Sequence, residues 1–351
     1  MVKLNTRKTK IIRDDLKAQI ETERLSRNDD RFRSHLGSSL IGDSCELKLK
    51  YNFFWTKKPT FKPNILRLFE TGQLQEQRIS KELRTIGATV LDVNPETGKQ
   101  WRFSEHFGHF GGSMDAVIEI DGVWYVGEYK THNDKSFKEL LKKGVEKSKF
   151  QHFAQMQTYM RLSNGIEKAL YFAVNKNNDE IYIEEVEYVP ELAESLSKKA
   201  ERIIFGGIMP GKLSTTPDYF ECKWCDFSGI CHGEEIPLVN CRTCKNFSII
   251  EENKFCSLRD EKIAFEDEVQ GCSTHIFNPD FMPGSFEFVG EDVDGKGFQT
   301  VQYKRNGKFY FNGFKRTKSI EFKNLEALEN EDVKKVKEVF PGATVTSVTG
   351  K

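Results

Sequence analysis

The sequence predicts an α/β protein in which helices flank a mixed β-sheet, followed by a cysteine-rich metal-binding region and a small β-rich tail. Between residues 1 and 215, segments with helical periodicity alternate with short strand-like runs. Residues 220–276 hold seven of the eight cysteines, and residues 277–351 return to strand-like patterns before a short helix. We therefore predict three units: a main domain over residues 1–235, a metal-binding module over residues 236–278 and a tail over residues 279–351.

Composition and charge are those of an ordinary globular protein. Hydrophobic residues make up 38% and charged residues 30% of the 351 residues, and Lys plus Arg equal Asp plus Glu at 53 each. The global charge gives no argument for nucleic-acid binding, so any such affinity has to come from local patches. Two basic patches are the run from Lys3 to Lys17 and the group Lys142, Lys143, Lys147 and Lys149. Each patch on its own is better explained as a solvated surface.

The chain has no apolar run long enough to span a membrane, and its first residues lack the apolar core of a signal peptide. We therefore expect a cytoplasmic protein with no membrane partner.

The segment 64–87 has the periodicity of one amphipathic helix. Alternating steps of four and three residues place seven positions on one face: Ile65, Phe69, Gly72, Glu76, Ile79, Leu83 and Ile86. Glu76 is then a carboxylate within an apolar stripe, where it needs a cation or a hydrogen-bonding partner. A glutamate at the helix edge that reaches solvent is the alternative.

Asp121-Gly122 predicts a tight β-hairpin, because this pair favours a two-residue type I′ turn and strand-like residues flank it. The register that this turn fixes places Asp115 opposite Glu128, with Cβ atoms roughly 4.5–5.5 Å apart. Two facing carboxylates destabilise a strand pair unless a positive charge lies between them. Lys130 lies two residues beyond Glu128 and projects from the same face. An exposed hairpin with a cross-strand charge cluster is the alternative.

The rest of the main domain follows from similar patterns. The glycine-rich loop around His109 precedes the hairpin, and its glycines leave room for a phosphate backbone to approach. The run 147–163 predicts a helix that stops at Asn164-Gly165 and carries Gln155 and Tyr159 one turn apart. Two strands follow, over 168–176 and 180–189, and then a helix that starts at Pro190.

Two carboxylates and an ammonium group on one hairpin are the groups that metal-assisted phosphodiester hydrolysis needs. Mg²⁺ and Mn²⁺ prefer carboxylate oxygens, and such a cation lowers the pKa of an attacking water. We expect Asp115 and Glu128 to supply the carboxylates, with Glu76 as a third. Lys130 is then the group that polarises the water or stabilises the developing charge.

Asp115 followed by Glu128-Tyr129-Lys130 resembles the D…ExK signature of the PD-(D/E)XK nuclease superfamily, which has a restriction-endonuclease-like fold. Gln155 to Tyr159 resembles the QxxxY motif of its RecB-like branch. The resemblance covers roughly residues 38–231. It implies that Asp115, Glu128, Glu76 and the backbone carbonyl of Tyr129 bind the metal. It also implies that Gln155 and Tyr159 steady the phosphate or Lys130.

The same resemblance implies an activity. It indicates a Mg²⁺- or Mn²⁺-dependent DNA exonuclease, encoded by a phage and present in the host cytoplasm. Its substrate would be linear DNA or single-stranded ends during recombination, replication or processing, with a helicase or an annealing protein as partner. A structure-specific or sequence-specific endonuclease on the same fold is one alternative. A non-catalytic DNA-binding module and a cysteine-rich zinc regulator are the others.

Eight cysteines in a reducing compartment predict metal sites rather than disulfides. Cys222, Cys225 and Cys231 supply three thiolates, and Cys45 is the cysteine left to complete a set of four. One cysteine before the nuclease core and three after it resembles the iron–sulfur staple of RecB-like nucleases, which implies a [4Fe–4S] cluster. Zinc also accepts four thiolates, and Cys45 as a small buried apolar residue is the other alternative.

The remaining cysteines predict a structural Zn²⁺ site. Their spacing gives one close pair and two separated ligands: Cys241, Cys244, Cys256 and Cys272. His275 is an alternative to Cys272 as the fourth ligand. A closed zinc site would stabilise a loop-rich segment that has few apolar residues of its own.

Overall fold

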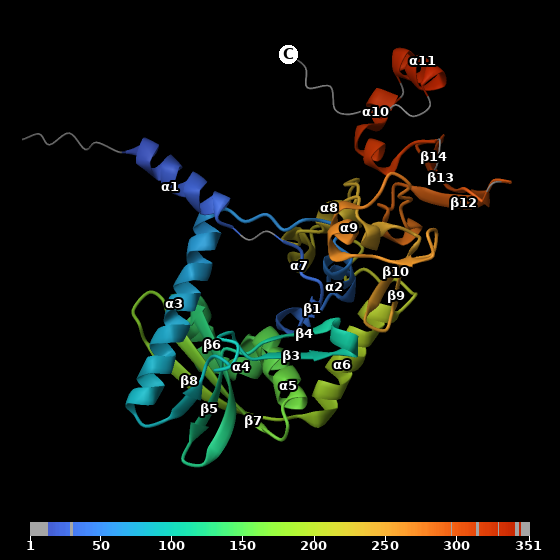
Figure 1. Ribbon diagram of the computed structural model, residues 1–351. Helices are drawn as coiled ribbons and strands as arrows, with labels where there is room; N and C mark the ends of the chain where they lie inside the picture. Colours follow the sequence, from blue (N-terminus) through green and yellow to red (C-terminus); the bar gives the residue numbers. More distant parts are fainter. Residues whose placement is uncertain are drawn as a thin grey trace, which may run out of the picture.

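A five-stranded mixed sheet lies at the centre of the main domain (Figure 1). The structure is a computed structural model that describes residues 13–28, 31–295, 297–313, 316–328, 330–340 and 344. In spatial order the strands are β2 (Thr89–Leu91), β5 (Ala116–Ile120), β6 (Val123–His132), β7 (Lys168–Asn175) and β8 (Ile181–Glu187). The β6–β7 pair is parallel and the other pairs are antiparallel, so the predicted mixed sheet is confirmed.

Helices cover both faces of this sheet. On one face Ile79 and Leu83 of α3 (Pro63–Thr85) pack against the apolar side chains of β5 and β7. On the other face lie α4 (Asp134–Ser148) and α5 (Phe150–Leu162), which contribute Phe137 and Met156 to the core. Because both faces are covered, β7 is apolar along nearly its whole length. The helix α4 was not among the predicted elements.

The hairpin β5–β6 has the predicted turn and register. Asp121 and Gly122 both have positive φ, at 53° and 81°, as a type I′ turn requires. Val117 pairs with Val126, as expected from the turn. This register decides which side chains of the two strands share a face.

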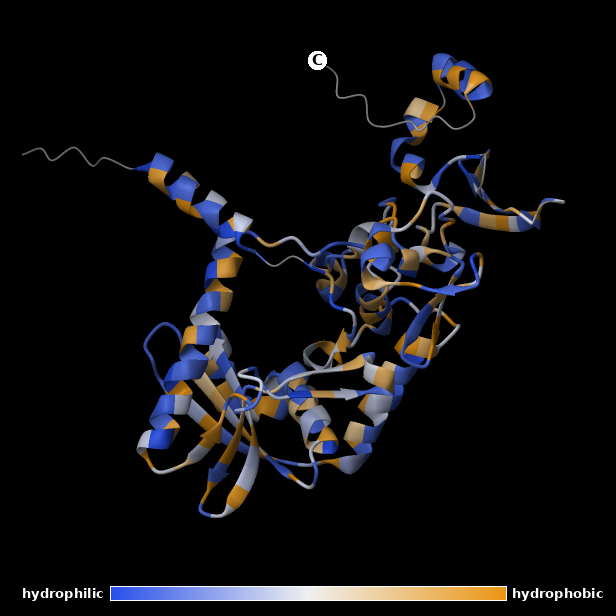
Figure 2. Ribbon diagram, in the orientation of Figure 1, coloured by the Kyte–Doolittle hydropathy of each residue, from blue (hydrophilic) through white to orange (hydrophobic). Residues whose placement is uncertain are grey.

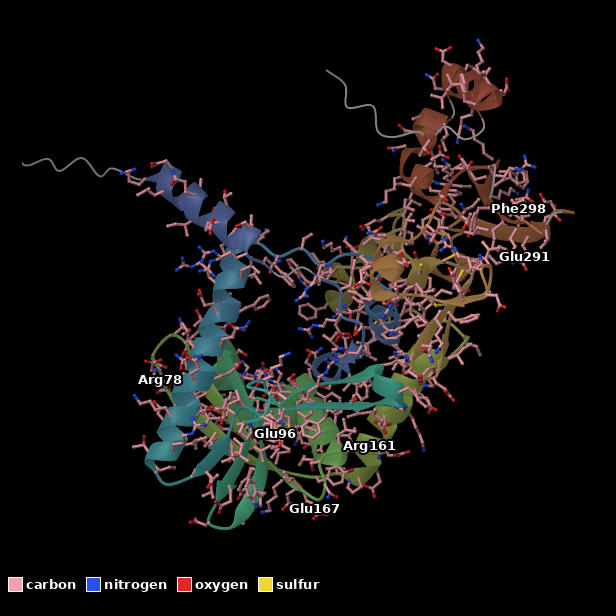
Figure 3. All side chains as sticks on the ribbon, in the orientation of Figure 1. Arg78, Glu96, Arg161, Glu167, Glu291 and Phe298 are labelled. Carbon is pink, nitrogen blue, oxygen red and sulfur yellow. The ribbon has the colours of Figure 1, made fainter. Side chains whose placement is uncertain are left out.

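A smaller sheet closes over the other side of α5. Its order is β1 (Leu36–Gly37), β4 (Phe110–Ser113) and β3 (Arg102–Glu105). The short helices η1 (Ser38–Leu40), α2 (Glu46–Phe53) and η2 (His106–Gly108) connect to this sheet, and α6 (Pro190–Phe205) begins at its proline as predicted. Arg161, labelled in Figure 3, joins α5 to Glu105 of β3 at 2.9 Å and to Glu194 of α6 at 3.0 Å.

The glycine-rich loop forms β4, and this corrects one expectation. A Cβ atom on Gly112 would lie 2.6 Å from the hydroxyl of Tyr159 and would also meet Ser38. A Cβ atom on Gly111 would meet the backbone of Phe103. The space at Gly111 and Gly112 is filled by the protein's own atoms, so the expected approach of a phosphate backbone is wrong at these two glycines. At Gly108 no atom lies within 4 Å of an added Cβ.

The predicted stripe on α3 is only half buried. Ile79 and Leu83 are buried, but Phe69 is 50% exposed and Ile86 is 76% exposed. The N-terminal half of α3 extends beyond the sheet and lies beside α1 (Asp14–Ser26), and together they form an arm that projects from the body (Figures 1 and 2). Ile86 lies past the helix end, which explains its exposure.

The basic patches differ in how far the structure describes them. Most of the run from Lys3 to Lys17 lies outside the described residues. In the second patch, Lys143 and Lys149 lie 2.8 Å and 3.6 Å from carboxylate oxygens of Glu139. Within the described parts of the chain, none of the helices combines the length and the apolar composition needed to cross a membrane.

A buried arginine attaches the cysteine-rich segment to the main domain. Arg242 has no exposed surface, pairs with Glu268 at 2.6 Å and donates to the carbonyl oxygen of Phe53 at 2.6 Å. Its guanidinium lies 3.7 Å from the ring centre of Trp55. The segment contains α7 (Phe220–Lys223), α8 (Ser228–Cys231), η3 (Cys241–Thr243), β9 (Phe247–Ile250), β10 (Asn253–Cys256), β11 (Glu261–Lys262) and α9 (Phe265–Gln270).

The tail is a small β-rich unit that ends in helices, as predicted. Its core includes Tyr303 and Phe322, and Phe277 of the preceding segment packs against them. The elements are η4 (Pro279–Phe281), β12 (Glu287–Val293), β13 (Gln299–Arg305), β14 (Lys308–Gly313), η5 (Ser319–Asn324), α10 (Leu325–Leu328) and α11 (Glu331–Val339). The division of the chain into three units stays a prediction.

Packing of the loop after η1 against α5 gives a test of the fold. A Cβ atom on Gly42 would lie 2.7 Å from Cα of Gln151 and 2.9 Å from Cβ of Ala154. We expect Gly42→Ala to lower the free energy of unfolding by about 1–3 kcal/mol in chemical denaturation, because the backbone has to move. The control is Gly72→Ala in α3, where no atom lies within 4 Å of the new Cβ. There we expect a gain of about 0.4–1 kcal/mol. A stable Gly42→Ala protein would contradict the described contact.

Candidate active site

Asp115, Glu128 and Lys130 lie together on the sheet face that α5 covers. Alternation along β6 puts Glu128 and Lys130 on this face, and Asp115 reaches it from the residue before β5. The ammonium of Lys130 donates to Oε1 of Glu128 and to the carbonyl oxygen of Tyr129, the latter at 3.2 Å. Oδ2 of Asp115 lies 3.8 Å from the same ammonium and accepts the backbone N–H of Tyr129 at 2.7 Å. The two carboxylates therefore surround one cation.

That cation is the chain's own lysine, and it lies where three predicted metal-binding oxygens converge. Glu128 is fully buried, and its second oxygen, Oε2, has no hydrogen-bond partner among the described residues. An unpaired carboxylate oxygen in the interior is costly, and a cation is a partner that removes this cost. The donor set is all oxygen, which is the set that Mg²⁺ and Mn²⁺ prefer. The residues present thus fit a divalent ion.

Burial and like charges make Glu128 and Glu76 hard to ionise. Burial raises the pKa of Glu128 to about 8 despite the opposing charge of Lys130, and Asp115 raises it further. Burial also raises the pKa of Glu76 to about 7, with Asp115 again adding to the shift and Lys130 opposing it. Burial acts to lower the pKa of Lys130, but the carboxylates of Glu128 and Asp115 raise it more, so it stays above its ordinary value. Glu76 therefore lies within the electrostatic reach of the site.

Gln155 and Tyr159 fix α5 against this site. The Gln155 side chain donates to the hydroxyl of Tyr159 at 3.4 Å, and that hydroxyl donates to the carbonyl oxygen of Ser113 at 2.7 Å. Ser38 donates to the same hydroxyl at 3.0 Å. Burial and the charge of Glu128 raise the pKa of Tyr159 to about 12, so the phenol stays protonated. The two motif residues lie beside the carboxylates and tie α5 to β4 and η1.

Two functional candidates, both histidines, were missed in the sequence. His132 lies two residues beyond Lys130 on the same face of β6, and His152 lies three residues before Gln155 on the same face of α5. Nε2 of His132 and Nδ1 of His152 each lie 2.8 Å from the hydroxyl of Tyr171. The signal in the sequence was the spacing. His132 continues the two-residue period of Glu128 and Lys130 along the strand, and His152 continues the three- or four-residue period of Gln155 and Tyr159 along the helix.

Cys45, Cys222, Cys225 and Cys231 come together, although Cys45 lies far from the others in the sequence. All four line one small pocket with the apolar side chains of Leu47 and Phe227, among others. Burial raises the pKa of Cys231, and the other three cysteines raise it further. The Sγ of Cys45 also accepts the backbone N–H of Lys48 at 3.4 Å, which caps α2. A set of four thiols in an apolar pocket is chemically suited to a four-thiolate metal group.

The four cysteines of the second set also lie near one another. Burial raises the pKa of Cys241 to about 12, and Cys244, Cys272 and Cys256 add to the shift in that order. The alternative ligand has other partners: Nε2 of His275 lies 3.2 Å from Oγ1 of Thr243, and Nδ1 lies 2.8 Å from Oγ of Ser319.

Among the residues that the structure describes, no three His, Cys, Asp or Glu side chains are arranged as a preformed metal-binding set. At the catalytic carboxylates the Lys130 ammonium lies between the oxygens that would otherwise converge.

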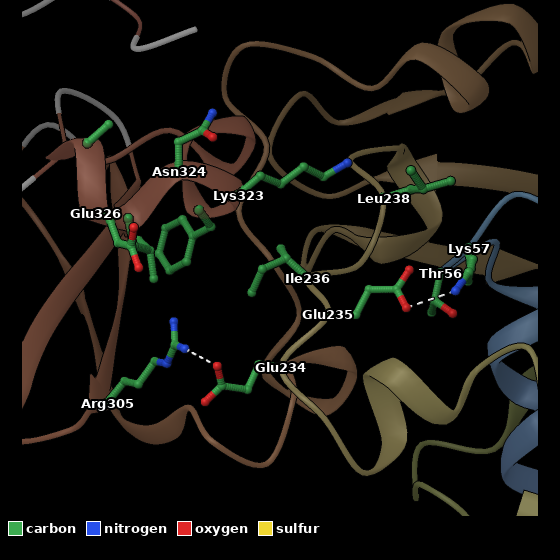
Figure 4. Close-up of a pocket in the computed structure, with 13 residues that line it drawn as sticks. Thr56, Lys57, Glu234, Glu235, Ile236, Leu238, Arg305, Lys323, Asn324 and Glu326 are labelled. Atoms are coloured by element: carbon green, nitrogen blue, oxygen red, sulfur yellow. Dashed lines mark hydrogen bonds and ion pairs between the residues drawn. The ribbon is translucent and has the colours of Figure 1, made fainter. Parts of the chain in front are cut away.

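A cavity of about 800 Å³ lies away from the carboxylates, between the tail and the rest of the chain (Figure 4). Two of its acids are paired within the protein: Glu234 with Arg305, and Glu235 with Lys57 at 2.8 Å. None of the predicted site residues is among the described residues that line it. We therefore do not assign the catalytic centre to this cavity, despite its volume.

Comparison with known proteins matches residues 56–232, half of the chain, to the PD-(D/E)XK nuclease superfamily. A search of curated proteins gives no match. Among solved structures, SSO0001 aligns with 62% of this chain and 96% of its own, at 18% identity and a TM-score of 0.39. The alkaline exonuclease LHK-Exo from Laribacter hongkongensis aligns with 53% of this chain and 90% of its own, at 16% identity and a TM-score of 0.36. Its complex with dAMP gives 15% identity over the same shares, also with a TM-score of 0.36.

The raised pKa values predict that metal binding depends on pH. Glu76 and Glu128, with pKa values of about 7 and about 8, hold protons in the metal-free protein at lower pH and lose them when a cation binds. We expect the Mn²⁺ affinity to rise by up to about tenfold per pH unit for each displaced proton as the pH increases toward these values. Calorimetric titration in buffers of different ionisation enthalpy measures both quantities. In Glu76→Gln one fewer proton should be released, and an affinity independent of pH would contradict the described electrostatics.

Proposed function

Because the chain belongs to the PD-(D/E)XK nuclease superfamily, we propose that it is a Mg²⁺- or Mn²⁺-dependent deoxyribonuclease that removes nucleotides from DNA ends. The observation that carries this proposal is the convergence of Asp115, Glu128 and the Tyr129 carbonyl on one cationic group. When bound, the divalent ion supplies charge neutralisation at the scissile phosphate and lowers the pKa of the attacking water.

The side chains of the site divide this work between them. Asp115, Glu128 and the Tyr129 carbonyl would hold the ion. Glu76 would serve as a third carboxylate, because the charges of Asp115 and Lys130 act on its pKa. Lys130 would then lose its contact with Glu128 and would be free to face the phosphate or to orient the water. Its pKa stays above the ordinary value, so it acts as a cation and not as a base.

Gln155 and Tyr159 have a positioning role in this proposal. Tyr159 is anchored at three points, by Gln155, Ser38 and the carbonyl of Ser113. The contacts with Ser38 and Ser113 tie α5 to η1 and β4, and they would thereby help to hold the phosphate and Lys130 in one geometry. The motif supports membership of the RecB-like branch. A phage role in recombination, replication or processing, with a helicase or annealing partner, rests on that branch resemblance.

We also propose that the first cysteine set holds a [4Fe–4S] cluster. Four thiols line one apolar pocket, and the burial of Cys225 and Cys231 raises their pKa values, a cost that coordination as thiolates would remove. Cys45 comes from the start of α2, and the other three from α7 and α8 or beside them. A shared group would therefore close the main domain over its own ends.

For the second set we propose Zn²⁺, with Cys272 as the fourth ligand. Both ring nitrogens of His275 are engaged with Thr243 and Ser319. Cys241, Cys244 and Cys272, in contrast, influence one another electrostatically. The few apolar residues of this loop-rich segment make a closed metal site the natural source of its stability.

The central test is metal-dependent degradation of DNA by the full-length protein. We expect wild-type protein with Mn²⁺ to degrade linear DNA and to leave covalently closed circles intact. Asp115→Ala and Lys130→Ala should each lower the rate by at least about 100-fold, because each removes an interaction made in the transition state. Gel-based rate measurements on linear and circular DNA decide the outcome.

The matched control is Lys168→Ala, which removes an exposed lysine from the neighbouring strand β7. Its rate should equal that of the wild type. Nicking of closed circles would replace the exonuclease by an endonuclease on the same fold. DNA binding without any metal-dependent degradation would leave only a binding module.

Metal analysis tests the two cysteine sites against each other. We expect Cys45→Ser, purified without oxygen, to lose its iron and its brown colour while keeping its zinc. Cys256→Ser should lose zinc and keep iron. Both contents are measured by elemental mass spectrometry with visible absorption spectra. Zinc at both sites and a colourless wild-type protein would contradict the cluster.

A further inference from the structure

A cavity of about 530 Å³ lies between the start of α5 and the cysteine segment. Lys149 and His152 line it from the junction of α4 and α5, and Trp224 lines it from the end of α7. Its volume is in the usual range for a site that takes one small ligand. The cavity lies near the β6 residues of the candidate site, because the ring centres of His152 and of His132, two residues beyond Lys130, lie 5.7 Å apart.

One of the two possible donor orders around Tyr171 lets His152 donate into this cavity, and an anion bound there would select that order. The Tyr171 hydroxyl has one hydrogen and lies between two histidine nitrogens, so it donates to one ring and accepts from the other. When it donates to Nδ1 of His152, the neutral ring carries its hydrogen on Nε2. His132 then donates to Tyr171 through Nε2 and accepts from Ser136, whose hydroxyl lies 3.2 Å from Nδ1. Burial lowers the pKa of His152 to about 2 and of His132 to about 4, so both rings are neutral.

The cavity also offers a positive charge. The Lys149 side chain is only 14% exposed. Its ammonium lies 3.6 Å from a carboxylate oxygen of Glu139 and donates to the carbonyl oxygen of Ser148 at 2.9 Å. Of the two acids that line the cavity, Asp43 pairs with Lys48 at 2.6 Å, whereas Glu221 accepts from the uncharged hydroxyl of Ser44 at 3.1 Å. An anion that enters the cavity therefore meets Lys149 and an imidazole N–H.

Aromatic surface borders the same cavity. Trp224 is 75% exposed and Phe150 is 45% exposed, and both line it. Exposed rings beside a phosphate-binding group are the arrangement that single-stranded nucleic acids use, because an unpaired base can stack on a ring. A base in a duplex is already paired and stacked, so it cannot do so without leaving the helix.

We propose that this cavity binds one nucleotide of a single DNA strand next to the catalytic centre. The phosphate is held by Nε2–H of His152 and the ammonium of Lys149, and the base stacks on Trp224. Glu128, Lys130 and His132 lie along one face of β6, and Tyr159, Gln155 and His152 lie along one face of α5. The cavity lies at the His152 end of the α5 row. The inference rests on the proposed nuclease function only for the identity of the strand as a substrate.

Binding without turnover tests this proposal. The anisotropy of a fluorescein-labelled dT12 strand is measured with full-length protein in buffer without Mg²⁺ or Mn²⁺, which prevents metal-dependent cleavage and leaves the cysteine sites loaded. We expect Trp224→Ala to weaken binding by about fivefold or more, and His152→Ala by about threefold or more. His152→Gln keeps a donor at the same reach and should bind within about twofold of wild type. Trp124→Ala removes a partly exposed tryptophan of the β5–β6 hairpin and should leave binding unchanged.

An abasic strand separates stacking from a structural effect. Wild type and Trp224→Ala should bind an abasic dodecamer equally, whereas equal weakening on both strands would show that Trp224 only supports the fold. Excess inorganic phosphate distinguishes the strand from a free anion. If phosphate displaces the strand, and abasic and normal strands bind alike, the cavity is a plain phosphate site and the proposal is overturned.

Unchanged dT12 binding by both Trp224→Ala and His152→Ala also overturns the proposal, whatever the nuclease assay shows. The expected binding pattern without Mn²⁺-dependent degradation has the opposite meaning. In that case the nuclease function fails and the strand-binding cavity stands.

Discussion

The ammonium of Lys130 lies between the carboxylates of Glu128 and Asp115, and this interaction sets the requirements for the rest of the main domain. Glu128 is fully buried, so a negative charge on it has to be compensated by a positive group inside the protein. The β5–β6 hairpin brings these groups together through the Asp121-Gly122 turn. Covering them with helices strengthens every charge–charge interaction at the site, because water is largely excluded.

The same exclusion explains why the acids of the site are poised for a second cation. One oxygen of Glu128 is unpaired among the described residues, and burial raises the pKa values of both Glu128 and Glu76. One lysine neutralises only one of two carboxylates, so a divalent ion would neutralise the negative charge that remains. The lysine is then available for the substrate. One side chain thus accounts both for the stability of the metal-free centre and for its proposed chemistry.

The parts of the chain outside the hairpin hold this centre in place. Tyr159 connects α5 to the small sheet, and Gly112 leaves the space that its hydroxyl needs. Arg242 attaches the cysteine-rich segment to α2 and the residues around it. The first cysteine set brings Cys45 and the segment of Trp224 to opposite sides of one pocket beside α5. These contacts place the aromatic border of the cavity next to the catalytic rows.

Local patterns were enough to predict much of the fold and of the site. The turn pair Asp121-Gly122 fixed the register, and alternation along β6 placed Glu128 and Lys130 on one face. Helical spacing paired Gln155 with Tyr159, and these residues are in contact. Glu76 was found because a carboxylate interrupted an apolar stripe. The exposure of Phe69 was not predicted, since periodicity says which residues share a face but not whether anything lies against that face.

The sequence by itself thus determined which chemical groups the hairpin carries and their order along each strand and helix, because these depend on interactions between near neighbours. Only the tertiary structure decided which distant groups meet. It placed Tyr171 between His132 and His152, filled the glycine space at β4 with the protein's own side chains, and engaged both nitrogens of His275. The physical reason is that such contacts depend on packing between segments far apart in the chain, and their geometry is set by the whole core rather than by local periodicity.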